Sequence, residues 1–249
     1  MPPPLPPAAR PWGFWATMGF SLLIFGVTLG VQSLALVIYI PVMKLAGKPF
    51  ELSELADNGF FLSIATCLST PVTVGLTVLL AWVRRGIAVR DYLALRMPTR
   101  GQVVRWFLVL GLYMVTADTL TLLSGRPLVP DVMVRFYQSS LVPPLMWFVL
   151  VVCAPLAEEI LFRGFMFEGL LRSRAGAAGA VVITSLLWSV VHLQYDLVEV
   201  GEVFLIGLLL GLVRLRTGSL CLTMLMHGVM NLIATGQVVW LIHTGQVSE

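Results

Sequence analysis

Charged residues are scarce in this chain. Of its 249 residues, 12% are Asp, Glu, Lys or Arg, whereas 58% are hydrophobic. A soluble domain is typically about one quarter charged and about half apolar. The mean hydropathy of +0.91 points the same way. The composition therefore excludes a soluble globular protein and predicts an integral membrane protein.

Cysteine is also rare. The sequence has only three cysteines, Cys67, Cys153 and Cys221, and they never occur in Cys-x-x-Cys spacing. An odd number of thiols in apolar segments argues against a disulfide framework and against a cysteine-based metal site.

The net charge of +3 is no sign of nucleic-acid binding, because membrane proteins collect Lys and Arg in cytoplasmic loops. We therefore expect a lipid bilayer, and no nucleic acid, as the partner.

Long apolar segments, in contrast, fill most of the chain. A helix needs about 20 apolar residues to span the hydrocarbon core. Seven segments reach or approach that length: Trp12–Met43, Phe60–Val83, Val103–Ser124, Leu141–Leu171, Ala178–Tyr195, Val203–Leu215 and Leu220–His243. The sixth has a short apolar core and can be tilted, re-entrant or extended at either end. Another segment, Val129–Gln138, can form an eighth, interfacial helix. The predicted fold is an all-α polytopic membrane bundle of about seven transmembrane helices.

The distribution of basic residues predicts the orientation of this bundle. The loop between the second and third predicted helices carries six arginines: Arg84, Arg85, Arg90, Arg96, Arg100 and Arg105. Short loops rich in Lys and Arg lie in the cytoplasm. With seven helices, this places the N-terminus in the cytoplasm and the C-terminus on the opposite side.

One predicted membrane helix is interrupted by three charged residues, Glu158, Glu159 and Arg163. Each charge at the centre of a membrane helix costs about 2.5–3.5 kcal/mol on insertion scales, so these side chains must face a protein interior or a water-filled cavity. Glu159 and Arg163 are four residues apart with the acid first, which favours an ion pair. Glu158 points about 100° away from Glu159, and we expect it to face the cavity.

Two further predicted helices carry polar residues at a comparable depth. His192 lies in the fifth segment, and His227 and Asn231 lie four residues apart in the seventh, on one helix face. With a rise of about 1.5 Å per residue, Glu158 and His192 lie about 20 Å from the cytoplasmic ends of their helices, and His227 about 10–13 Å. All of these depths fall within the hydrocarbon thickness of about 30 Å, so the three clusters can meet.

A carboxylate, two imidazoles and a carboxamide are the components of a hydrolytic site. Glu158 can take a proton from water, and His192 can hold that water or protonate the leaving amine. His227 and Asn231 can donate hydrogen bonds to a developing oxyanion. Glu158, His192 and His227 are also suitable ligands for Zn²⁺, although the H-E-x-x-H motif is absent. The sequence leaves open whether the water is activated by glutamate or by a metal.

Three ordered motifs resemble those of the CAAX protease and bacteriocin-processing family, whose members are intramembrane endopeptidases and include the type II CAAX prenyl endopeptidases. The resemblance covers about residues 145–235. The motifs are Glu158-Glu159-x-x-x-Arg163, Trp188-x-x-x-His192 and His227-x-x-x-Asn231. The second motif of the family usually begins with Phe, so Trp188 is a departure, and we expect it to alter packing or substrate contact while the chemistry is retained.

The resemblance implies roles for the site residues, and together with the composition it divides the chain into regions. It implies that Glu158 activates water, that His192 helps to position it and that His227 and Asn231 form the oxyanion site, while Glu159 and Arg163 support them. The chain then divides into three regions: a proline-rich tail at 1–11, membrane helices at 12–140 and the catalytic bundle at 141–243, which comprises the last four helices.

The expected substrate is a membrane-associated protein or peptide, and the expected location is a bacterial inner membrane. Similar proteins act in the maturation or C-terminal sorting of surface proteins, as myxosortases do, or in bacteriocin processing. Two other hypotheses stay open: a non-catalytic membrane immunity or scaffold protein, and a membrane transporter. Many transporters contain inverted repeats, and no internal repeat is visible in this sequence.

Overall fold

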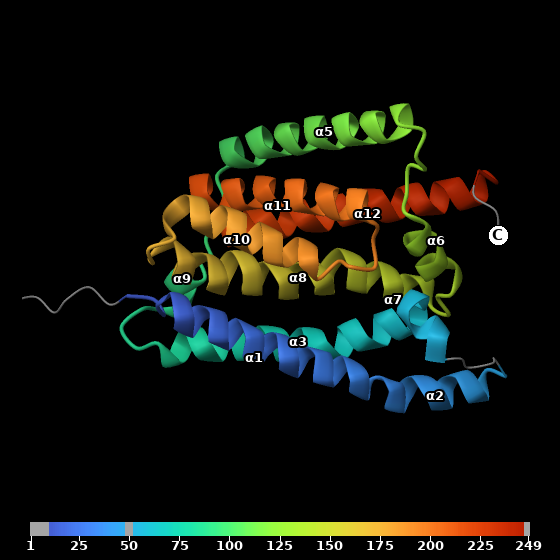
Figure 1. Ribbon diagram of the computed structural model, residues 1–249, viewed down its shortest axis with the longest axis horizontal. Helices are drawn as coiled ribbons and strands as arrows, with labels where there is room; N and C mark the ends of the chain where they lie inside the picture. Colours follow the sequence, from blue (N-terminus) through green and yellow to red (C-terminus); the bar gives the residue numbers. More distant parts are fainter. Residues whose placement is uncertain (1–9, 48–51, 247–249) are drawn as a thin grey trace, which may run out of the picture.

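The computed structural model describes residues 10–47 and 52–246, and this part of the chain consists of helices and connecting turns, without any strand. Figure 1 shows the long helices running alongside one another, with α5 outermost, α10–α12 beneath it, and α1 and α3 on the far side of the helix labelled α8. The predicted all-α polytopic membrane bundle is confirmed. The elements are α1 (Phe14–Leu34), α2 (Leu36–Leu45), η1 (Leu52–Asp57), α3 (Gly59–Val83), α4 (Val89–Tyr92), α5 (Arg100–Leu123), α6 (Asp131–Gln138), α7 (Pro143–Phe148), η2 (Val149–Cys153), α8 (Ala154–Glu159), η3 (Ile160–Met166), α9 (Phe167–Leu171), α10 (Gly176–Val190), α11 (Leu197–Thr217) and α12 (Leu220–His243).

Each of the seven predicted membrane segments corresponds to a helix or to a run of consecutive helices. Within the described residues, five stretches are long and apolar enough to cross a membrane: Phe14–Leu45, Gly59–Val83, Arg100–Leu123, Pro143–Leu171 and Leu220–His243. The other two predicted segments form α10, which has 15 residues, and α11, which has charged residues in both its first and its last turn. Most of the proline-rich tail lies outside the described residues.

The α10–α11 hairpin differs from the prediction in one respect that matters for the site. α10 ends at Val190, so His192 lies in the following turn and not on a membrane helix, and its predicted helical placement was wrong. α11 begins earlier than predicted because Asp196 and Glu199 form a reciprocal capping box at its N-terminus. α10 is only about 22 Å long at 1.5 Å per residue, shorter than the hydrocarbon core of about 30 Å.

The predicted eighth segment is helical, but it packs on the bundle. Three apolar residues of α6, Val132, Val134 and Phe136, are buried. Val134 clusters with Val238 of α12, and Phe136 clusters with residues of the helix that begins at α7. The apolar face of this short helix is therefore covered by protein.

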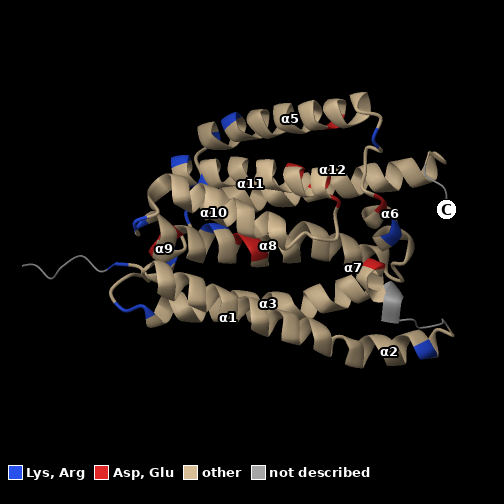
Figure 2. Cartoon of the chain, viewed as in Figure 1, with Lys and Arg blue, Asp and Glu red and all other residues tan. Residues whose placement is uncertain are grey.

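The charged residues are distributed unequally between the two ends of the bundle. Figure 2 shows most Lys and Arg at the end where α3 leads to α5 and where α9 and α10 meet, with a few on α2 and near α6, whereas most Asp and Glu lie in the middle or toward the α6 end. This separation agrees with the loop charges read from the sequence. We call these the basic end and the acidic end.

A continuous helix from α7 to α9 carries the Glu-Glu pair through the centre of the bundle. Two of its segments, η2 and η3, have π-helical hydrogen bonding and flank α8. Such π segments occur mostly as single turns inside α-helices, and often at functional sites. A π turn changes which face of the helix each following residue occupies, so η2 affects the orientation of α8, and η3 that of α9, relative to the start of the helix.

Candidate active site

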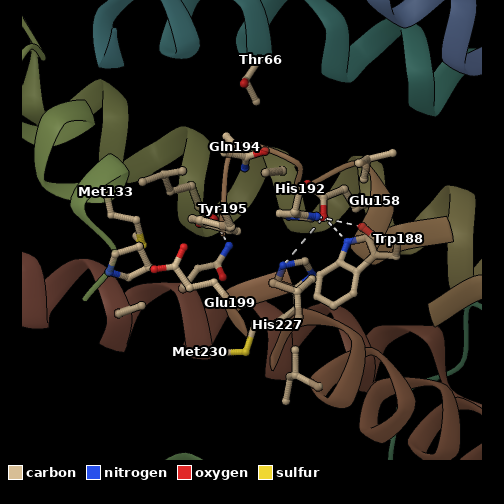
Figure 3. Close-up of a pocket in the computed structure, with 18 of the residues that line it drawn as sticks. Thr66, Met133, Glu158, Trp188, His192, Gln194, Tyr195, Glu199, His227 and Met230 are labelled. Atoms are coloured by element: carbon tan, nitrogen blue, oxygen red, sulfur yellow. Dashed lines mark hydrogen bonds and ion pairs between the residues drawn. The ribbon is translucent and has the colours of Figure 1, made fainter. Parts of the chain in front are cut away.

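A cavity of about 590 Å³ lies between these helices. Its walls come from α1, α3, α5, α8, α11, α12 and the turn after α10, and it reaches toward the acidic end, where Asp118, Met133 and Glu199 line it. The predicted site residues that line it are Glu158, His192, His227 and Asn231. Figure 3 shows Glu158, Trp188, His192 and His227 grouped at one end of this cavity.

The predicted ion pair between Glu159 and Arg163 is present and fully buried. The Arg163 Nη1 atom donates to Glu159 Oε1 at 3.0 Å, and neither side chain is exposed. The Arg163 Nη2 atom also donates to the backbone carbonyl of Gly207 on α11, at 3.3 Å. The pair therefore ties the central helix to α11 and lies behind the cavity wall, as expected for supporting residues.

His227 connects the two adjacent glutamates. Its Nδ1 atom lies 3.1 Å from Glu159 Oε1, and its Nε2 atom lies 4.0 Å from Glu158 Oε2. Because an ionised carboxylate only accepts hydrogen bonds, the contact with Glu159 places the Nδ1 proton of His227 toward Glu159 and leaves Nε2 facing Glu158. The sequence did not predict this contact between Glu159 and His227.

Glu158 faces the cavity, as predicted, and its side chain is 25% exposed. Its Oε2 atom accepts a hydrogen bond of 2.5 Å from the indole Nε1 of Trp188. Within the described residues, no Lys or Arg side chain lies within ion-pair distance of Glu158, in contrast to its neighbour Glu159. Glu158 is thus a carboxylate held by neutral or imidazole donors beside open space.

Asn231 reaches the backbone of the central helix. In η2, the Ala154 N–H donates to the Val149 carbonyl five residues earlier, so the next such donor would be Pro155, which has no N–H. The Leu150 carbonyl left by this gap accepts from Asn231 Nδ2 at 2.8 Å. Asn231 therefore supplies the missing hydrogen-bond donor to the Leu150 carbonyl, and it also lines the cavity.

A glycine on the same face of α12 allows this contact. A side-chain carbon at Gly228 would lie 2.8 Å from the Val151 carbonyl oxygen, closer than two such atoms can approach. Glycine therefore lets α12 come near enough to the central helix for Asn231 to reach Leu150.

His192 joins the site through Trp188. Its Nδ1 atom lies 2.8 Å from the Trp188 carbonyl, which can only accept, so Nδ1 carries the proton and Nε2 is left as an acceptor. The His192 ring lies edge-on to the indole, with 5.1 Å between the ring centres. It also stacks on the Tyr195 ring, with 5.9 Å between the ring centres. The indole also meets the His227 ring edge-on, at 5.2 Å.

The three candidate zinc ligands do not form one metal site. Across residues 10–47 and 52–246, no three His, Cys, Asp or Glu side chains are close enough together to hold a metal ion. Glu158 and His227 are neighbours, but His192 makes its contacts through Trp188. The donor set therefore does not fit Zn²⁺, which takes at least three protein ligands in catalytic sites.

Comparison with known proteins identifies the region that contains this site. Residues 140–233 match the family model described as Type II CAAX prenyl endopeptidase Rce1-like, which confirms the resemblance predicted from the motifs. This is a peptidase family. The matched region contains every predicted site residue from Glu158 to Asn231.

A relative and the solved structures add little more. An "Uncharacterized 24.3 kDa protein" of Escherichia coli is 45% identical over 80 residues, which is 30% of this chain. The chain covers 36% of the length of that relative. No solved structure matches the chain.

Proposed function

We propose that this membrane protein is a glutamate-dependent intramembrane endopeptidase and that residues 141–243 form its catalytic bundle. One observation carries the proposal. A carboxylate without an Arg or Lys partner, Glu158, lies on a cavity wall with its Oε2 atom 4.0 Å from His227 Nε2, inside a region that matches a peptidase family. A charge in this position is too costly to be retained without a use or a partner.

The spacing of Glu158 and His227 suits a single bound water. Two hydrogen bonds of about 2.8 Å from one water span the 4.0 Å between Glu158 Oε2 and His227 Nε2 at an angle of about 90°. Glu158 takes a proton from this water, and at the same time the water oxygen bonds to the scissile carbonyl carbon. The C–N bond then breaks, Glu158 returns the proton to the leaving nitrogen, and the products are a carboxylic acid and an amine.

The remaining polar groups act on the water or on the oxyanion. A neutral His227, with its proton on Nδ1, accepts from the water through Nε2. A protonated His227 donates from Nε2 to the oxyanion. Asn231 uses one amide hydrogen for the Leu150 carbonyl, and an amide carries two, so the second is left for the oxyanion. When His227 is the donor to the oxyanion, the second hydrogen of the water is accepted instead by His192 Nε2, which helps to hold the water.

The shape of the cavity favours a substrate that is cut near the acidic end of the bundle. The cavity runs from Glu158 toward α6 and the start of α11, away from the basic end (Figure 2). We assign the basic end, and with it the N-terminus, to the cytoplasm of a bacterial inner membrane. The substrate is then a membrane protein or peptide cut toward the outer face, as in anchor trimming of surface proteins or maturation of exported peptides.

The test is the substitution Glu158→Gln, which keeps the shape of the side chain and removes the base. New protein termini in the membrane proteome are quantified in cells with wild-type or substituted protein at matched levels. We expect termini that depend on the wild-type protein to fall by about 10²–10⁴-fold, the usual contribution of a general base. The matched control is Asp91→Asn, which makes the same chemical change in an exposed pair with Arg96.

The outcome of this experiment also separates the competing functions. If the same termini form at the wild-type rate in Glu158→Gln cells, the protein is not a glutamate-dependent peptidase. A cellular phenotype that survives without any dependent cleavage would favour the scaffold or transport hypothesis.

A further inference from the structure

The indole of Trp188 is the direct hydrogen-bond donor to the proposed base. Its Nε1 atom donates to Glu158 Oε2 at 2.5 Å, and Figure 3 shows the indole edge turned toward that carboxylate. An indole N–H is only a donor, so the direction of this hydrogen bond is unambiguous. The contact joins α10 to α8 at the cavity wall.

The surroundings of Trp188 hold its ring in one orientation. The side chain is 2% exposed, and the Arg163 guanidinium lies over the ring at 4.4 Å from its centre. The two imidazoles contact it edge-on at 5.1 and 5.2 Å. On α11, a side-chain carbon at Gly207 would lie 3.1 Å from Trp188 Cε3, so glycine leaves the space that the indole occupies.

We propose that Trp188 is a positioning residue that holds the Glu158 carboxylate in its working orientation; this rests on the proposed role of Glu158 as the base. A carboxylate has about four lone-pair sites, and one hydrogen bond from Trp188 leaves the others for water and His227. Phenylalanine, the residue that the motif resemblance leads one to expect here, has no donor. In this chain, the indole N–H supplies a support that a phenyl ring at the same position lacks.

The buried Glu159–Arg163 pair is linked to this support. Arg163 donates to Glu159 through Nη1, and its guanidinium carbon lies over the Trp188 ring. A cation over an aromatic face is attracted to the ring. The ion pair behind the wall thus helps to hold the indole, and the indole holds Glu158.

The first test reads the hydrogen bond itself. Protein labelled with ¹⁵N-tryptophan in lipid nanodiscs gives one indole N–H signal for each of the seven tryptophans, and the signal absent from Trp188→Phe is that of Trp188. We expect this proton signal far downfield, and we expect it to move upfield in Glu158→Ala. An unchanged Trp188 signal in Glu158→Ala would overturn the proposal.

The second test reads the effect on cleavage with a replacement that keeps the shape of the ring. Trp188 is replaced by β-(3-benzothienyl)alanine, in which sulfur replaces the N–H group, and the initial rate of the Glu158-dependent cleavages is measured in cells. We expect about a 10-fold or larger loss, as for one hydrogen bond to a charged group. The same replacement at Trp240, which is 55% exposed on α12, is the control and should leave the rate unchanged.

A double substitution separates positioning from packing. If Trp188 acts through Glu158, its replacement causes no further loss of residual activity in a Glu158→Gln background. An equal loss in both backgrounds would overturn the positioning role. If Glu158→Gln is inactive and the sulfur isostere cleaves at the wild-type rate, only this proposal fails. If Glu158→Gln is fully active, the endopeptidase proposal fails with it, and the nanodisc signal still decides whether the hydrogen bond forms.

Discussion

Two clusters of charge, one at the cavity and one at the end of the central helix, differ in composition. The cavity cluster consists of Glu158, Glu159 and Arg163, and the end cluster consists of Glu168, Arg172 and Arg214. In the end cluster, Glu168 accepts from Arg172 at 3.1 Å and from Arg214 at 3.3 Å. That cluster has one arginine more than it has acids, whereas the cavity cluster has one acid more than it has arginines.

The surplus group of the cavity cluster is the residue to which the proposed mechanism assigns the chemistry. Arg214 donates to the Arg163 carbonyl at 3.0 Å, and its guanidinium carbon lies 5.2 Å from the centre of the Phe167 ring. The surplus arginine of the end cluster therefore has protein partners. In the cavity cluster, Arg163 pairs with Glu159 alone, and Glu158 is left facing open space. A buried charge with full pairing is explained by structure, whereas an acid in surplus beside a cavity needs another explanation.

The largest effect on stability should come from breaking the buried pair in the cavity cluster. Arg163→Met leaves Glu159 charged and buried without its cation, and we expect the free energy of unfolding to fall by about 3–5 kcal/mol. Unfolding in nanodiscs, followed by circular dichroism against denaturant, measures this loss. Arg216→Met, at an exposed position on α11, is the matched control.

The corresponding double substitution sharpens the same test. Replacing both Glu159 and Arg163 by Met removes the uncompensated charge, and stability should recover in large part. Activity should not recover, because His227 loses the acceptor on its Nδ1 atom. If Arg163→Met unfolds at the wild-type denaturant concentration, the pair is not a structural support, and the contrast between the two glutamates collapses.

The sequence predicted contacts within one helix better than contacts between helices. The Glu159–Arg163 pair and the outward direction of Glu158 follow from a spacing of four residues and from helix geometry alone. The Trp188–Glu158, His227–Glu159 and Asn231–Leu150 contacts depend on how each helix is rotated against its neighbours, which the spacing does not determine. Helix existence was likewise predictable from apolar length, while the end of α10 before His192 was not.

The π segments explain part of this limit. Pro155 has no N–H to donate, and the structure shows π-helical turns on both sides of α8. Each π turn contains one residue more than an α turn, so the residues after it are rotated about the helix axis. The spacing of apolar residues in the sequence does not reveal this rotation. Trp188 was visible as a departure from the expected motif, but its hydrogen bond to Glu158 required the packed structure.

A smaller effect should come from the end cluster. Arg214→Met removes one of two arginines from Glu168, which keeps Arg172 and is 12% exposed. The Arg163 carbonyl also loses its Arg214 donor. We expect a loss of about 1–3 kcal/mol, the cost of leaving a buried acceptor without this donor, and cleavage per folded molecule close to that of the wild type. Arg172→Met, whose guanidinium is 65% exposed, should cost less. A loss of cleavage as large as that in Glu158→Gln would show that the two clusters are not separable.

The smallest effect belongs to a third pair, between Arg126 and Asp196 at the exposed acidic end of the bundle. The hydrogen bond from Arg126, aided by backbone donors of α11, holds the pKa of Asp196 below its usual value. A lowered pKa in the folded state contributes stability above the unfolded-state pKa of about 3.9, and this contribution is lost as the pH falls through the folded-state value. Asp196→Asn keeps a helix-capping side chain, so the thermal midpoint should fall slightly at pH 7, and the difference should vanish in acid and shrink in high salt. If the thermal midpoints of wild type and Asp196→Asn differ by the same amount from pH 7 to pH 3, helix capping and not charge stabilises this end. Ion pairing alone would then not account for the differences between the charge clusters.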